Sequence, residues 1–410
     1  MSDISCTVDA VWRIEGARVI ATLARVTGDL GLAEDLAQEA VADALAQWPA
    51  SGVPQNPGAW LTAVAKRRAI DGWRRRERLD ERYRALAHEL DDSVDGADAW
   101  QPIDDDVLRL VFTACHPVLS REAQVALTLR VVGGLTTEEI ARMFLVPVAT
   151  IQQRIVRAKK TLGAAKVPFE APDPAEWKSR LGSVLGVVYL VFTEGYAATS
   201  GDTWIRKDLA NEALRIGRIL AALVPREPEA HALVALMELQ ASRFGARVSP
   251  TGEPILLENQ DRTRWDHSQI ARGRAALARA DALGRGRANY ALQAAIAECH
   301  ATAPSVEGTD WAQIVLLYEA LSQLTRNPVV DLNRAVAVSM ATGPASALLI
   351  VDRIVDEGSL RGSALLPGVR GELLARLGRT EEARSEFVTA ASLTANDRQR
   401  EVILAKIEQL

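Results

Sequence analysis

The sequence predicts an all-α protein, and three observations carry that prediction. Ala, Leu, Arg and Glu dominate the 410 residues, and strict alternation of apolar and polar residues is rare. Apolar residues instead recur at helical spacing. Glycine and proline are sparse within these segments and cluster between them, where they interrupt helices. Hydrophobic residues make up 48% of the chain and charged residues 25%, which favours packed cores over disorder.

Two interruptions divide the chain into three helical blocks. The first is an acidic, turn-rich linker at 86–103, and the second is the proline-rich stretch at 167–176. The predicted domains are therefore 10–85, 104–165 and 177–410. The first two would be small and the third large.

Composition also limits the class of protein. The longest apolar run is too short to span a bilayer, and no basic segment followed by an apolar one marks a secretory signal. Cys6, Cys115 and Cys299 lie far apart and match no metal or disulfide spacing. We expect a reduced, cytoplasmic protein with no membrane span, bound metal or cofactor.

Charge is unevenly distributed along the chain, although its net value is only −5. Residues 66–84 contain nine Lys or Arg against four acids, and residues 154–166 contain five basic residues and no acid. Between them, residues 86–106 contain eight acids and no basic residue. Because local charge governs binding, two basic patches separated by an acidic linker are compatible with DNA contact.

The first block contains an acidic helix followed by a basic one. In the helix expected over 31–48, one stripe is apolar: Ala33, Leu36, Ala37, Ala40, Val41, Ala44 and Leu45. An acidic face lies off that stripe, which is either merely solvated or a docking surface: Glu34, Asp35, Gln38 and Glu39.

The basic helix, 56–79, can begin at Pro57 and interleaves aromatic with cationic residues. Trp60 and Trp73 accompany Lys66, Arg67, Arg68, Arg74, Arg75 and Arg76. Cations for phosphates and flat rings for unstacked bases are what a protein needs to bind a single strand. The alternative is a cationic surface helix whose tryptophans belong to the core.

The second block ends in a predicted helix-turn-helix, "LTTEEIARMFLVPVATIQQRIVRAKKTL". Thr136 and Glu139 form a capping-box pattern, and Pro147 suits the start of the second helix. The buried face of that helix would be Ile151, Ile155, Ala158 and Leu162. Its polar side chains remain for a partner: Thr150, Gln152, Gln153, Arg154 and Arg157. Gln and Arg can read base edges in the major groove, whereas Lys159 and Lys160 suit phosphates.

The third block shows degenerate repetition of small and large packing positions. "GELLARLGRTEEARSEFVTAASL" places Gly371, Ala383 and Phe387 where a tetratricopeptide unit brings two helices together. We expect a TPR-like helical domain, with a generic helical bundle as the alternative.

Taken in order, these features resemble bacterial extracytoplasmic-function sigma factors of RNA polymerase, over residues 10–165. "AEDLAQEAV" resembles region 2.2, "AWLTAVAKRRAIDGWRRR" resembles regions 2.3 and 2.4, and the helix-turn-helix resembles region 4.2. The third block resembles the long extension of one subgroup. The resemblance implies a sigma factor that directs promoter-specific transcription, without catalytic residues, and carries a regulatory or partner-binding extension.

The resemblance also implies roles for individual residues. Asp35, Gln38 and Glu39 would dock on the β′ clamp helices of core polymerase. Residues of the basic helix would melt and read the −10 element: Trp60, Lys66, Arg67, Asp71, Arg74, Arg75 and Arg76. Residues of the last helix would contact the −35 element, near the β flap: Thr150, Gln152, Gln153, Arg154, Arg157, Lys159 and Lys160. The extension would bind a protein or a small molecule.

Three departures limit what is carried over. Arg67 stands where the family often has Asn, Leu145 where it often has Gly, and Gln152-Gln153 where it often has Lys-Ser. The promoter sequence therefore does not follow from the resemblance.

Two other functions fit parts of the sequence. A helix-turn-helix regulator with a TPR-like sensor would act without polymerase docking, but it leaves the acidic helix unexplained. An enzyme would need a site such as Glu194, Tyr196 and Asp202, which we interpret as structural, as we do Cys115-His116.

Overall fold

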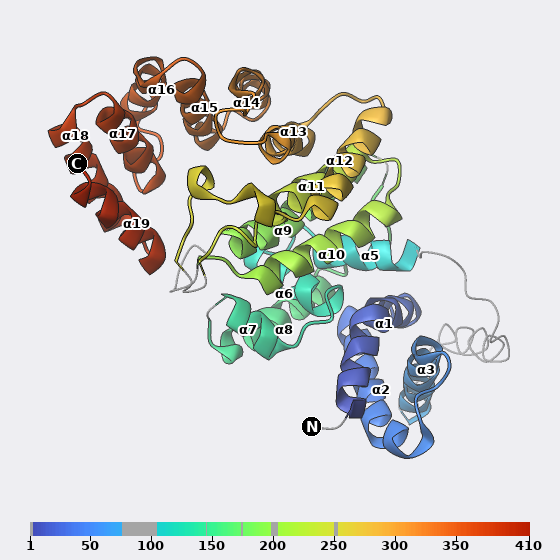
Figure 1. Ribbon diagram of the computed structural model, residues 1–410. Coiled ribbons are helices and arrows are strands. Elements are labelled where there is room, and N and C mark those ends of the chain that lie inside the picture. The colour runs from blue at the N-terminus through green and yellow to red at the C-terminus, as the bar shows by residue number, and fades with distance from the viewer. Residues whose placement is uncertain (1–2, 76–104, 145, 174, 198–203, 250–252) are drawn as a thin grey trace. The chain divides into compact units, whose positions relative to one another are not determined.

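The computed structural model describes residues 3–75, 105–144, 146–173, 175–197, 204–249 and 253–410. Helices make up the regular structure of these residues, in which extended backbone pairs only at the isolated bridge between Val248 and Pro254 (Figure 1). The prediction of an all-α protein is confirmed. No described helix combines the length and apolar character needed to cross a membrane.

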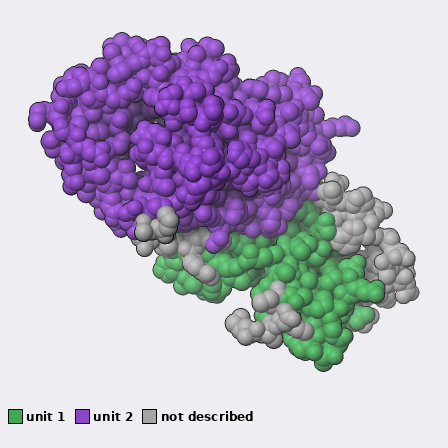
Figure 2. All heavy atoms as spheres, in the orientation of Figure 1, with its two compact units in different colours: residues 1–188 green, residues 189–410 purple. Residues whose placement is uncertain are grey.

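The chain forms two compact units, residues 1–188 and 189–410 (Figure 2). Unit 1 contains α1 (Asp3–Thr27), α2 (Leu30–Ser51), α3 (Pro57–Arg75), α5 (Asp105–Ala114), α6 (Arg121–Val131), α7 (Thr137–Phe144), α8 (Val148–Ala164) and the first part of α9 (Trp177–Tyr196). The acidic linker at 86–103 lies outside the described residues.

The division between the units falls inside α9, whose first turns belong to unit 1. The Trp177 ring lies 5.1 Å from the Phe112 ring of α5, measured between centroids. Arg180 donates a hydrogen bond to the Phe112 carbonyl oxygen. These contacts come from residues that the sequence analysis had placed in the third block.

The first three helices pack on one another around a small core. Asp29 caps α2 by accepting hydrogen bonds from the amides of Gly31 and Leu32. Most of the expected apolar stripe of α2 is buried, but Val41 is only half-buried and Leu45 is 44% exposed, so the prediction is wrong at Leu45. The buried face continues through Ala44 to Trp48, so Leu45 falls beyond its edge.

Unit 2 contains the end of α9 and a series of further helices. They are α10 (Lys207–Leu223), α11 (Pro228–Ala241), η1 (Leu257–Asn259), η2 (Arg262–Arg264), α12 (His267–Ala282), α13 (Asn289–Thr302), α14 (Trp311–Thr325), α15 (Pro328–Ala341), α16 (Pro344–Asp356), α17 (Leu365–Arg376), α18 (Thr380–Leu393) and α19 (Asp397–Glu408). From α10 to α19 each α-helix packs on the next. Packing between sequence neighbours is the pattern of helical repeat arrays.

The repeat positions noted in the sequence lie at a tight helix contact. A Cβ atom built on Gly371 of α17 would approach the Phe387 ring of α18 to 2.8 Å. Phe387 and Ala383 are buried in the same core cluster. The absence of a side chain at Gly371 therefore lets α17 and α18 approach each other.

We expect Gly371→Ala to lower the stability of the array and Gly368→Ala, on the same helix, to raise it. An alanine stabilises a helix by about 0.5–1 kcal/mol over glycine, and nothing lies within 4 Å of a Cβ at Gly368. At Gly371 the clash with Phe387 offsets that gain, since overpacking costs about 1–3 kcal/mol. Amide hydrogen exchange of α17 and α18 in the full chain measures both effects. Equal stabilisation by the two variants would contradict this packing.

Candidate functional site

The polar face of α2 is divided between solvent and the interior of unit 1. Asp35 and Glu39 are exposed and Gln38 is half-buried, so these three remain accessible. Glu34 differs, because its side chain is only 4% exposed. The expectation that Glu34 belongs to the same open face as Asp35 is therefore wrong.

Glu34 is buried because two cations from distant segments surround it. The Arg130 Nε atom of α6 donates to its carboxylate at 2.6 Å, and the Lys159 Nζ atom of α8 lies 2.6 Å from its other oxygen. Lys159 also lies 3.5 Å from Asp35. A carboxylate removed from water is stable only with such partners. Glu34 therefore links α2 to α6 and α8.

On α3, the aromatic and basic residues are in several different environments. The Trp60 ring meets Trp48 edge-on, with centroids 5.4 Å apart, so one of the proposed base-stacking residues contributes to packing. Lys66 is half-buried, and burial, with the nearby Arg25 charge, lowers its pKa. Arg67 and Asp71 are exposed.

Arg68 was not among the candidate site residues, and it bridges α3 to α2. Its guanidinium contacts the Asp43 carboxylate at 2.7 Å and Glu39 at 2.9 Å. These hydrogen bonds raise the pKa of Arg68. Glu39 thus combines an exposed position with a cationic neighbour.

Three arginines of the −10 prediction cannot be placed. Arg74 and Arg75 end α3, but their side chains lie outside the described residues, as does the whole of Arg76.

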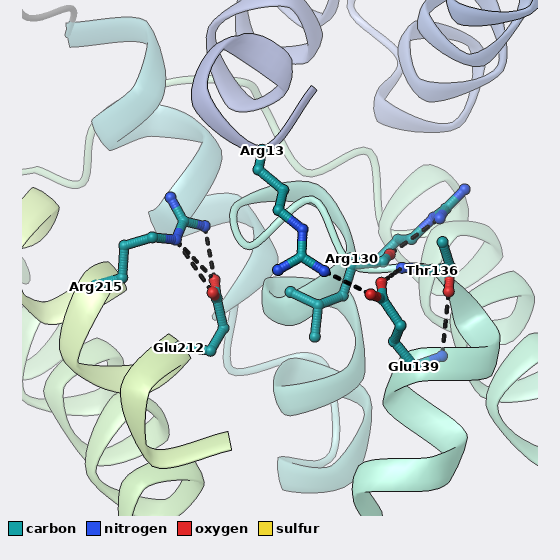
Figure 3. Close-up of polar contacts among 7 residues, drawn as sticks. Arg13, Arg130, Thr136, Glu139, Glu212 and Arg215 are labelled. Atoms are coloured by element: carbon teal, nitrogen blue, oxygen red, sulfur yellow. Dashed lines mark hydrogen bonds and ion pairs between the residues drawn. The ribbon is translucent and has the colours of Figure 1, made fainter. Parts of the chain in front are cut away.

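The helix-turn-helix has the capping geometry that its sequence predicts. The Thr136 hydroxyl accepts from the Glu139 amide at 3.1 Å, and the Glu139 carboxylate accepts from the Thr136 amide at 2.8 Å (Figure 3). Glu139 also pairs with Arg13 of α1 at 2.5 Å. The capping box is confirmed, and it fixes where α7 begins.

Helix α8 starts one residue later than expected. Pro147 is the residue before the helix rather than its first residue, and its backbone, with φ −58° and ψ 143°, is not helical. Leu145, which stands where the family often has Gly, lies outside the described residues. The predicted buried face of α8 is confirmed: Ile151, Ile155, Ala158 and Leu162.

The polar residues of α8 differ in their accessibility. Gln152, Gln153, Arg157 and Lys160 are exposed, whereas Thr150 and Arg154 are half-buried. Lys159 is half-buried and engaged with Glu34 and Asp35, as described above. The exposed side chains form a polar surface on the second helix of the motif, where base contacts are expected in such motifs.

The residues considered for an enzyme are in structural contacts. Glu194 pairs with Arg206 at 2.7 Å. Burial raises the pKa of the Cys115 thiol to about 11, and the thiol contacts Thr128. Asp202 is not described, and among the described residues no cluster of three His, Cys, Asp or Glu could bind a metal.

Comparison with known proteins identifies three segments of the chain. Residues 12–79 match the model of sigma-70 region 2, and residues 109–162 match that of sigma-70 region 4. Residues 180–281 match a family of unknown function, DUF6596. The two sigma-70 matches contain the polar faces of α2, α3 and α8.

Two relatives illustrate the similarity over longer stretches. The uncharacterized protein R00370 of Rhizobium meliloti is 42% identical over 407 residues, which cover 96% of this chain and 93% of the relative. The probable ECF RNA polymerase sigma factor SigI of Mycobacterium tuberculosis is 28% identical over 172 residues, covering 41% of this chain and 58% of that protein. No solved structure matches the chain.

Because Glu34 is buried and Glu39 is exposed, we expect substitutions of these two residues to lower the free energy of unfolding by different amounts. We expect Glu34→Gln to lower the free energy of unfolding by about 2–4 kcal/mol, because Arg130 and Lys159 lose their anion inside the unit. Glu39→Gln removes an exposed ion pair and costs about 0.5 kcal/mol. Denaturant unfolding of full-length variants, followed by tryptophan fluorescence, measures both.

A second substitution separates this ion-pair network from general packing. Adding Lys159→Met to Glu34→Gln removes one uncompensated cation and should recover part of the loss. Equal losses for Glu34→Gln and Glu39→Gln would contradict the network.

Proposed function

Because the chain belongs to the extracytoplasmic-function type of RNA polymerase sigma factors, we propose that it directs core polymerase to particular promoters by contacting two DNA elements. One observation carries the proposal. The helices that match regions 2 and 4 each present exposed polar residues at the positions expected to contact polymerase and DNA.

In this proposal α2 docks on the β′ clamp helices of polymerase. The exposed carboxylates of Asp35 and Glu39, with Gln38 beside them, supply charge and hydrogen-bond acceptors. Exposed charges of this kind steer association and fix its register more than they add affinity.

Helix α8 reads the −35 element in the major groove. Gln152, Gln153 and Arg157 lie exposed on one helix and have the side chains that pair bidentately with adenine and guanine edges. Lys160 contacts phosphate, which positions the helix without specifying sequence.

The end of α3 binds the opened −10 strand. Arg67 is exposed there, and the basic run continues through Arg74, Arg75 and Arg76. Because the Trp60 ring packs on Trp48, we expect Trp60 to contribute little to base stacking. Binding the single strand favours the melted promoter because the duplex form lacks that contact.

Neither DNA contact needs to be tight alone. Polymerase would hold α3 and α8 at the spacing of the −10 and −35 elements. Once one helix has bound DNA, binding of the other becomes intramolecular and is favoured by its high effective concentration. Nucleotide chemistry stays with polymerase, and the factor needs no catalytic residue.

The ion pairs of Lys159 give the free factor a competing state. Lys159 contacts Glu34 and Asp35, so it cannot contact DNA phosphate while those pairs persist. We infer that promoter engagement by Lys159 requires separation of α8 from α2, whereas Asp35 is exposed and accessible to polymerase in either state.

Unit 2 is assigned a regulatory role in this proposal. It comprises residues 189–410, and a family of unknown function covers its first part. A helical array offers extended surfaces and cavities for a protein or a small molecule.

We expect Asp35→Ala/Gln38→Ala to weaken co-purification with core polymerase by about tenfold, a loss of ~1.4 kcal/mol. The control Asp9→Ala/Gln47→Ala removes the same groups from exposed positions on α1 and α2. A DNA-binding regulator that acts without polymerase would show no difference between the two pairs.

We expect Arg157→Ala to change the sequence preference of DNA binding and Lys160→Ala to change only its strength. We expect Arg157→Ala to cost about 1–3 kcal/mol and to relax sequence preference at one −35 position. Lys160→Ala should weaken binding to all promoters alike and reduce the salt slope by about one. Holoenzyme binding to a library of −35 sequences at several salt concentrations separates them. The same preference profile for Arg157→Ala as for wild type would refute base reading.

Truncation tests the regulatory role, and the cut belongs after Val188 because Trp177 and Arg180 pack on α5. Run-off transcription from a promoter pool should change by about tenfold between the full chain and residues 1–188, if unit 2 shifts a two-state equilibrium by ~1.4 kcal/mol. Unchanged transcription from all promoters would remove unit 2 from the proposal.

A further inference from the structure

Unit 2 contains a cavity whose size and lining suit a small molecule. Its volume is about 270 Å³, and residues of α9, α11, α13, α14 and α15 line it. This is near the lower end of the range for small-molecule sites, and it is too small for a peptide segment. Apolar walls come from Leu239, Ile296 and Leu321, and polar groups from Gln293, Asn333 and Arg243.

Three arginines lie in or near this cavity; Arg243 lines it, and the charge of Glu307 acts on Arg262. Arg243 lines the cavity and donates to the Tyr196 hydroxyl. The guanidinium carbon of Arg247 lies 3.8 Å from the centroid of the Tyr196 ring, and that of Arg262 lies 4.6 Å from the centroid of the Trp265 ring. Among the described residues, no Asp or Glu lies within ion-pair distance of these three arginines. Aromatic faces stabilise the cations but carry no compensating charge.

Nearby titratable groups respond to this surplus of positive charge. Burial and the charges of Arg243 and Arg262 lower the pKa of His300, another lining residue, to about 4. Burial alone would raise the pKa of Tyr196, but Arg243 and Arg247 outweigh it and lower the pKa. One terminal nitrogen of Arg262 is buried without a hydrogen-bond partner. An anion in the cavity would relieve the repulsion among these groups.

We propose that the cavity binds a small organic carboxylate, with its charge at Arg243 and its apolar part against Leu239 and Ile296. Gln293 and Asn333 then orient the ligand through their amides. The apolar walls favour an organic anion over inorganic phosphate, because phosphate has no apolar part to pack against them. Arg243 suits a carboxylate because its planar guanidinium can pair with both oxygens.

This inference deepens the regulatory role proposed for unit 2, and only its consequence for transcription rests on that role. Ligand binding links helices α9 to α15 and would stabilise the conformation that contains the cavity. Binding is measured without polymerase or DNA, so it can succeed while regulation fails, and the reverse.

The test uses full-length protein and saturation-transfer NMR with benzoate, salicylate, phenylacetate and hexanoate at millimolar concentration. Benzamide is the neutral match for benzoate, and inorganic phosphate is the anion without an apolar part. We expect at least one of the four carboxylates to bind. For benzoate or salicylate, binding should be about tenfold tighter than that of benzamide. Binding by none of the four, or equal binding of benzoate and benzamide or of benzoate and phosphate, would overturn the proposal.

Variants locate the site. Arg243→Gln should weaken the bound carboxylate about tenfold, whereas Arg279→Gln, an exposed arginine on α12, should leave its affinity unchanged. Ala297→Phe fills the cavity while retaining Arg243 and should abolish binding. If Arg243→Gln does not fold, Ala297→Phe still tests whether the ligand binds in this cavity, and the benzamide comparison still tests whether its charge matters. Wild-type affinity in Ala297→Phe would overturn the assignment.

Discussion

A buried carboxylate needs cations nearby, and in unit 1 that requirement joins helices far apart in the chain. Glu34 lies on the first domain's acidic helix, while Arg130 and Lys159 come from the helices that form and support the helix-turn-helix. Each ion alone would be costly inside the protein, and together they are compatible with burial. The orientation of α2 against α6 and α8 therefore depends on keeping all three charges paired.

The same contact connects structure to the sigma-factor role. Lys159, a candidate for DNA phosphate, pairs with Glu34 and also lies 3.5 Å from Asp35, a candidate for polymerase. Binding partners would compete with an internal ion pair rather than meet two free surfaces. The Lys159–Asp35 pair is partly exposed and weak, whereas the Lys159–Glu34 pair is buried, so releasing Lys159 would depend mainly on the Glu34 contact.

Unit 2 also contains a buried carboxylate, Glu238, which pairs with Arg218 and Arg272, and close helix packing is prominent in it. Close helix approach, as at Gly371 against Phe387, builds an array in which each helix contacts its neighbours. The same array leaves a cavity beside arginines that lack carboxylate partners. Apolar contacts and ion pairs both contribute there, and the proposed carboxylate ligand would add a partner for Arg243.

The sequence by itself determined the all-α class, the capping box at Thr136, the buried face of α8 and the exposed positions of Asp35 and Glu39. All of these follow from spacing within a few residues, because local hydrogen bonds and helical periodicity decide them. Only the tertiary structure decided that Glu34 is buried, that Lys159 is paired and that residues of several helices line a cavity. Arg130 is 96 residues from Glu34. The energy of such a pair depends on desolvation, which exists only once the helices have assembled.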